Sequence, residues 1–167
     1  MRTLSTIIFC FLLFNCANNS KKQKQEKFTY ERTQENIQKS EKDSNEVEII
    51  INSFDSMVFD KNKIKVESGK TIILTLNHKG KIGKEFMGHN FVLLKKEIDV
   101  DNFAKRAVSA KENDYIPISD DMIAYTKMIG GGESTTIKFL APEPGNYIYI
   151  CSFPGHYMMM RGEFLVT

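Results

Sequence analysis

One loop of the sequence holds several potential metal ligands close together: Cys151-Ser152-Phe153-Pro154-Gly155-His156-Tyr157-Met158-Met159-Met160. It follows a run of strand-forming residues, and its Pro-Gly pair supplies a sharp turn. The turn brings a thiol, an imidazole and thioethers onto one loop. Thiolate and thioether sulfur are soft ligands, so the loop predicts a site for a soft metal ion.

A second imidazole belongs to Gly88-His89-Asn90, at the head of another apolar run. With Cys151 and His156 it offers two nitrogens and one sulfur in a near-trigonal plane, and a methionine adds a weak axial sulfur. This is the ligand set of an electron-transfer copper site. Cu(I) favours soft, low-coordinate surroundings, whereas Cu(II) favours nitrogen. A rigid site that offers both sulfur and nitrogen donors suits both oxidation states, so little structural reorganisation is needed when an electron arrives or leaves.

Cys151 has no evident disulfide partner. The chain has three cysteines, and if Cys10 leaves with an export signal and Cys16 is acylated, Cys151 is the remaining thiol. On composition alone, a buried structural cysteine and a metal ligand explain a lone thiol equally well. The neighbouring imidazole and thioethers favour the metal.

Residues 1–16 are predicted to be an export signal, because their apolar run is too short for a transmembrane helix and polar residues follow at once. Leu13-Phe14-Asn15-Cys16 resembles a bacterial lipobox, although Phe14 and Asn15 are bulkier than the residues usual there. We expect acylation at Cys16, a periplasmic or other cell-envelope location, and membrane contact only through the lipid. Cleavage and release without a lipid is the alternative.

The rest of the chain divides at about Asn45. Residues 17–45 are mostly Lys, Gln, Glu, Asn, Ser and Thr and hold too few large apolar side chains to form a core, so they are predicted to be a disordered polar tether. Residues 46–167 are predicted to form one domain. The formal net charge of +2 and the lack of a basic stripe in this domain argue against nucleic acid as a partner.

Short β-type runs separated by Gly and Pro turn signals fill the predicted domain, and their spacing describes an antiparallel, all-β sandwich. Apolar residues recur at helical spacing from Ile98 to about Lys111, which predicts one helix outside the sandwich. The predicted strands cover residues 47–51, 64–67, 72–76, 91–94, 136–139, 147–151 and 164–166.

From Met57 to Thr167 the chain resembles azurins, the bacterial blue-copper proteins of the cupredoxin family. Residues 87–93 are similar to the family's first ligand segment, and residues 123–130 to its middle strand. Residues 151–160 reproduce the ligand loop, with four residues between Cys and His and three between His and Met; plastocyanin-like relatives have a shorter Cys-to-His interval. The resemblance implies a cupredoxin-type Greek-key β-sandwich of about eight strands.

The resemblance also implies one type 1 copper ion and a set of ligands for it. Met158 and Met159 compete for the axial place, but spacing favours Met160. The implied ligands are His89, Cys151 and His156 in the equatorial plane, Met160 as the distant axial ligand, and the Gly88 carbonyl on the opposite side.

Three other residues receive roles through the resemblance. Asn90 would tie the two ligand segments together, and with the backbone N–H of Phe153 it would stabilise the thiolate; an ordinary turn residue is the alternative for Asn90. His78 matches a buried family histidine and is not expected to be a ligand. The chain departs from the family in lacking the N-terminal structural disulfide and any Trp, and in having Tyr125 where some members have a surface histidine.

The function implied is electron transfer by Cu(I)/Cu(II) cycling, without enzymatic activity. The partners would be redox proteins, with a c-type cytochrome suggested. They would dock near His156 on an apolar patch of Met87, Phe153, Pro154 and Met158.

Other functions fit the sequence less well. The chain has three histidines, too few for a second, catalytic copper site, and Gly155 stands where a binuclear centre would need a second cysteine. Copper storage or delivery through the methionines is the main alternative. A hydrolase using Cys151 and His156 lacks an orienting partner.

Overall fold

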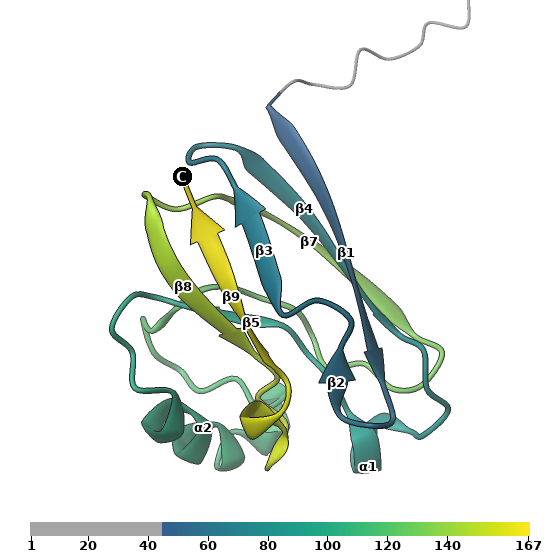
Figure 1. Ribbon diagram of the computed structural model, residues 1–167. Helices are drawn as coiled ribbons and strands as arrows, with labels where there is room; N and C mark the ends of the chain where they lie inside the picture. Colours follow the sequence, from purple (N-terminus) through teal and green to yellow (C-terminus); the bar gives the residue numbers. More distant parts are fainter. Residues whose placement is uncertain (1–44) are drawn as a thin grey trace, which may run out of the picture. The chain divides into compact units, whose positions relative to one another are not determined.

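The computed structural model describes residues 45–167, which form a two-sheet β-sandwich (Figure 1). The predicted export signal, Cys16 and nearly all of the predicted tether lie outside these residues. The strands are β1 (Glu46–Phe54), β2 (Val58–Phe59), β3 (Lys63–Val66), β4 (Thr71–His78), β5 (Val92–Leu94), β6 (Met122–Tyr125), β7 (Ser134–Leu140), β8 (Gly145–Ile150) and β9 (Arg161–Val166). The helices are α1 (Lys84–Met87), α2 (Val100–Val108) and the 3-10 turns η1 (Lys111–Asn113) and η2 (His156–Met158).

The predicted β-sandwich is present, and its two sheets are mixed, whereas the strand spacing described an antiparallel sandwich. Their strand orders are β2-β1-β4-β7 and β3-β9-β8-β5-β6. β1 pairs with β4 in parallel, and β3 pairs with β9 in parallel. Alternating burial reports which side chains face the core but not the direction of the neighbouring strand, because parallel neighbours here come from segments that are not consecutive in the chain.

β4 shows how the sequence pattern builds the core and also positions the candidate site. Its burial alternates strictly along eight residues, so every second side chain faces the opposite sheet. Ile72, Leu74 and Leu76 are fully buried, and each such side chain contributes about 1.5–3 kcal/mol relative to exposure. The next inward position is His78, which the same alternation places at the end of the core.

The predicted helix is present but shorter than expected. α2 begins after Asp99, whose carboxylate caps the helix by accepting from the Asn102 N–H at 3.0 Å. Phe103 and Ala107 are buried and pack in a second cluster that includes Ile150. The helix therefore covers the outer face of the sheet near β5 and β8.

The predicted strand runs are all present, with boundaries shifted by a few residues. The apolar pattern did not predict the two-residue β2, and β6 was expected only from the family resemblance. None of the helices in the described part, residues 45–167, has the length and apolar character needed to span a membrane.

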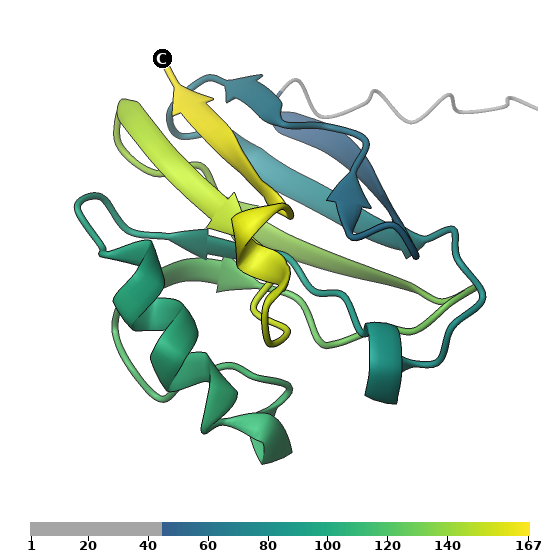
Figure 2. The ribbon, with the colours of Figure 1, turned by 60° about the horizontal axis from the view of Figure 1, so that its bottom comes forward.

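The loops that carry the predicted ligands gather at one end of the sandwich. In both views the segment after β8, which contains η2, lies between α1 and α2, and the C-terminus lies at the opposite end (Figures 1 and 2). This end is called the copper end below.

Candidate metal centre

The ligand loop is closed by its own backbone hydrogen bonds. The Cys151 N–H donates to the Met160 carbonyl at 2.9 Å, and the Met160 N–H donates to the His156 carbonyl at 2.8 Å. The turn between them passes through Gly155 at φ +81°, a conformation that favours glycine. These hydrogen bonds and the glycine turn give the loop a defined shape.

Asn90 joins the second predicted ligand segment to this loop. Its side-chain oxygen accepts from the Ser152 N–H at 2.8 Å, and its Nδ2 donates to Ser152 Oγ at 2.8 Å and to the Asp114 carbonyl at 3.2 Å. His89, the preceding residue, exchanges two backbone hydrogen bonds of 2.9 Å with Ile129. The segment that contains His89 and the ligand loop are thus held to each other, and His89 is also held to Ile129 in the connection between β6 and β7.

Replacing Asn90 by Ala is expected to lower the free energy of unfolding by about 2–4 kcal/mol, because it leaves buried donors and acceptors without partners. Urea unfolding monitored by circular dichroism measures this change. The exposed Asn62→Ala is the matched control and should change stability by less than about 0.5 kcal/mol. Equal effects at the two positions would show that the Asn90 bridge does not hold the loops together.

The structure places the predicted donor atoms close together in the interior. Cys151 Sγ lies 3.8 Å from His156 Nδ1 and 3.8 Å from the Gly88 carbonyl oxygen. The rings of His89 and His156 have their centroids 5.2 Å apart. Cys151, His89 and Met160 are fully buried, and His156 is 4 % exposed. Among residues 45–167, no three His, Cys, Asp or Glu side chains form a metal-binding group by themselves, so the ligand assignment is a proposal.

The buried, unpartnered ring of His89 shows that the site fits a metal ion. Both ring nitrogens are buried, and within the described residues neither has a hydrogen-bond partner. A buried polar group without a partner costs about 1–3 kcal/mol, and an ion that the structure does not contain is one of the explanations. The neighbouring soft sulfur of Cys151 makes copper a suitable ion.

The protonation states also suit a metal site. Desolvation by burial lowers the pKa of His89 to about 3 and that of His156 to about 4, and repulsion from His78, when that ring is protonated, adds to both shifts, so both imidazoles are neutral at pH 7. Burial raises the pKa of the Cys151 thiol to about 12, although hydrogen bonding by the backbone of Asn90 and Phe153 opposes this rise. The thiol therefore holds its proton until a cation replaces it.

His78 lies beside the site with its nitrogens already in use. Its ring stacks on that of His89 at 4.2 Å between centroids. Its Nδ1 accepts from the Gly80 N–H at 3.0 Å, so the proton must be on Nε2, which donates to the Met87 carbonyl at 2.9 Å. No lone pair is left for a metal, in keeping with the expectation that His78 is not a ligand.

The three methionines of the ligand loop differ in how much of their side chains is exposed. Met158 and Met159 are 65 % and 59 % exposed, whereas Met160 is fully buried. On the other side, a Cβ on Gly88 would lie 2.5 Å from the Lys84 carbonyl oxygen and 2.8 Å from Met128 Sδ. A side chain at Gly88 would therefore displace the backbone whose carbonyl faces the thiol.

Sequence reasoning did not identify Asp114, Tyr115 and Met128. Asp114 and Tyr115 both have positive φ, and the carboxylate of Asp114 accepts from the Met128 N–H at 3.1 Å while its carbonyl accepts from Asn90. The Tyr115 ring lies 5.2 Å from that of Phe153 in the ligand loop. The turn-forming pair Asn113-Asp114 was the available signal, because Asp and Asn tolerate the left-handed conformation.

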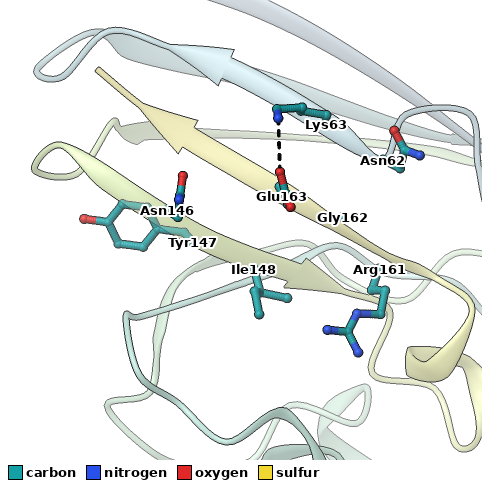
Figure 3. Close-up of a pocket in the computed structure, with 8 residues that line it drawn as sticks. All are labelled: Asn62, Lys63, Asn146, Tyr147, Ile148, Arg161, Gly162 and Glu163. Atoms are coloured by element: carbon teal, nitrogen blue, oxygen red, sulfur yellow. Dashed lines mark ion pairs between the residues drawn. The ribbon is translucent and has the colours of Figure 1, made fainter.

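One hollow lies away from the candidate centre, on the outer face of β3, β9 and β8 (Figure 3). It has a volume of about 590 Å³ and is lined by charged and amide side chains, among them the Lys63–Glu163 ion pair at 3.3 Å. Among the residues that line this hollow, Arg161 is adjacent to the ligand loop in sequence, because it directly follows Met160. The candidate metal centre is separate from this hollow, and the burial of Cys151, His89 and Met160 makes it a closed site.

A two-sheet sandwich with two imidazoles, a thiol and a thioether gathered at one end defines the cupredoxin class, and copper is the cofactor of that class. The model of copper-binding proteins of the plastocyanin/azurin family matches residues 44–167. The chain belongs to this family.

The relatives include azurin-1 of Alcaligenes xylosoxydans xylosoxydans, 40% identical over 114 residues, which cover 65% of this chain and 88% of that protein. Outer membrane protein H.8 of Neisseria gonorrhoeae is 39% identical over 117 residues, covering 68% of this chain and 63% of that longer protein. Among solved structures, reduced auracyanin of Roseiflexus castenholzii has a TM-score of 0.66 at 35% identity and covers 72% of this chain and 96% of its own. An azurin of Methylomonas sp. strain J has a TM-score of 0.65 at 36% identity, with coverage of 72% and 97%.

Proposed function

We propose that this protein is a type 1 copper electron carrier in which His89, Cys151 and His156 are the equatorial ligands, Met160 is the axial ligand and the Gly88 carbonyl faces the ion from the other side. The observation that carries the proposal is the buried, unpartnered imidazole of His89 beside the thiol of Cys151. Family membership supports the same class of function.

The protein residues would hold the site in one shape while an electron arrives and leaves. Bound copper supplies the one-electron exchange between Cu(II) and Cu(I). The backbone bonds that close the ligand loop and the Asn90 bridge to Ser152 resist movement of the donors. Burial of Cys151 and Met160 excludes water from the sulfur side. A preformed, dry site keeps the reorganisation small.

Adding Cu(II) to the purified protein tests the proposal. The expected result is an intense blue thiolate-to-copper absorption band and reversible one-electron cycling in voltammetry. Copper storage or delivery is the second candidate, because Met158 and Met159 are exposed thioethers at the site's edge. A colourless protein that releases Cu(I) to a chelator would support delivery and contradict electron transfer.

Met160→Leu is expected to raise the reduction potential while the protein stays blue, because loss of the axial sulfur favours Cu(I) and leaves the three equatorial donors in place. Voltammetry and the visible spectrum measure the two effects. The exposed Met159→Leu is the matched control and should leave the potential nearly unchanged. An unchanged potential in Met160→Leu would show that the axial assignment is wrong.

The partner and the location belong to the same proposal. An electron would pass at the edge of His156, the least buried of the donors, and Met87, Phe153, Pro154 and Met158 would form the surrounding contact patch for a redox protein such as a c-type cytochrome. An exported, cell-envelope protein is consistent with the relative named as an outer membrane protein. Lipid attachment at Cys16 would be tested by mass spectrometry of the N-terminal peptide from membrane fractions.

A further inference from the structure

The rim of the copper end carries opposite charges on its two sides. Residues 79–87 hold three lysines and one glutamate, all of them exposed. Residues 97–121, which contain α2, hold seven carboxylates and three basic side chains. We call Lys79, Lys81 and Lys84 the basic lip, and Asp99 and Asp101 the acidic lip. The described residues as a whole are almost neutral, with 15 basic and 16 acidic side chains, so the contrast is local.

The basic lip is fixed to the candidate metal centre at both ends. Its segment starts after His78 and leads into His89, and these two rings are stacked. The Asp55 carboxylate accepts from the Lys81 N–H at 2.8 Å and from the Ile82 N–H at 3.3 Å. Asp55 offsets part of the positive charge, but it also holds the loop backbone in place, so the lysines project from a defined position.

The acidic lip lies against the other side of the ligand loop. Tyr157, the residue after His156, packs against the same apolar cluster as Ile98 and Val100, and Asp99 and Asp101 stand on either side of Val100 in the chain. Both carboxylates are therefore close to η2. α1 and α2 lie on opposite sides of the ligand loop in both views (Figures 1 and 2), so the two lips flank the edge of His156.

We propose that this two-signed rim sets the rotational orientation of the redox partner, a protein whose docking face has an acidic edge that meets the basic lip and a basic edge that meets the acidic lip. The inference rests on the proposed electron-transfer function and extends it. An apolar patch alone leaves a partner free to rotate about the contact, whereas exposed charges of opposite sign steer and align it during encounter.

Paramagnetic mapping tests the charge pattern without electron transfer. The full-length chain, ¹⁵N-labelled and studied with and without Cu(I), would be titrated with the redox-inert ions hexacyanochromate(III) and hexaamminechromium(III). The expected result is amide broadening by the anion at residues 79–88 and by the cation at residues 99–102. Broadening by the anion that is as strong at Lys65 and Lys70, near the opposite end, would overturn the proposal.

Neutralising variants test the consequence for electron transfer. The basic-lip variant is Lys79→Gln, Lys81→Gln and Lys84→Gln, and the acidic-lip variant is Asp99→Asn and Asp101→Asn, in which Asn preserves the helix cap. At low salt the first should slow oxidation of the Cu(I) protein by hexacyanoferrate(III) about tenfold, and the second should slow its reaction with a basic c-type cytochrome about tenfold. Both effects should fade near 1 M salt, where the Debye length is about 3 Å.

The control is Lys65→Gln with Lys70→Gln, which removes two positive charges far from the copper end and should leave both rates nearly unchanged. If each lip variant alters both reactions equally, or only as much as the control, the rim does not orient a partner. A protein that binds copper but exchanges no electrons would contradict the proposed function, and the broadening pattern would still decide whether the rim is two-signed.

Discussion

Cys151→Ser is expected to abolish the blue absorption band and to weaken copper binding by more than about 100-fold, because the hydroxyl is a hard, poorly acidic donor that cannot replace a thiolate. The thiol is fully buried and lies 3.8 Å from both His156 Nδ1 and the Gly88 carbonyl oxygen. Titration with Cu(II), followed by visible absorption and electron paramagnetic resonance, measures both losses.

The serine side chain is nearly isosteric with cysteine, so the variant should keep its fold, and circular dichroism would verify this. Met158→Leu removes an exposed sulfur from the same loop and should keep the full blue band. A Cys151→Ser protein that remained intensely blue would show that the colour comes from another ligand set and that the assignment of Cys151 is wrong.

The copper-free protein is expected to lose stability as the pH falls from about 6.5 towards 4.5. The folded-state pKa values of His89, about 3, and His156, about 4, lie below the ordinary value of 6.5, so in this range the unfolded chain binds more protons than the folded chain. The free energy of unfolding therefore rises with pH across the window. One pKa unit corresponds to about 1.4 kcal/mol, so the two groups together should remove on the order of 3–5 kcal/mol by pH 4.5.

Urea unfolding at pH 7.0, 5.5 and 4.5 measures this dependence, and the window ends just above the ordinary pKa values of Asp and Glu, about 3.9 and 4.3. The double variant His89→Gln, His156→Gln lacks both titrating rings and should show a much flatter profile. A profile as steep as that of the parent chain would place the responsible groups elsewhere in the domain.

Local pattern was enough to predict most of the strands and the helix. The alternation of Ile72, Leu74 and Leu76 reports a half-buried strand because successive side chains face opposite sides of a sheet, and the ligand loop was recognised from the order of its donor types. The direction of pairing between β1 and β4 was not predictable from such patterns, because it depends on how distant segments return to the same sheet.

The contacts around the candidate site also could not be predicted from sequence patterns. Nothing local to Asp114 indicates that its carbonyl receives the side chain of Asn90 or that its carboxylate receives the Met128 N–H. These contacts join residues far apart in the chain, so they arise only when the sandwich has closed. The same holds for the stacking of His78 on His89, although the strict alternation of β4 already placed His78 facing inward.

The burial of the donors has a consequence for how the protein acquires its metal. With Cys151, His89 and Met160 fully buried and His156 only 4 % exposed, a hydrated ion cannot reach the thiol while the ligand loop is closed. We therefore expect metal loading to require a transient opening of the η2 turn, so that this opening and not diffusion would limit the rate of metal uptake. A loop that closes in this way would slow the uptake of the metal ion and, for the same reason, its release.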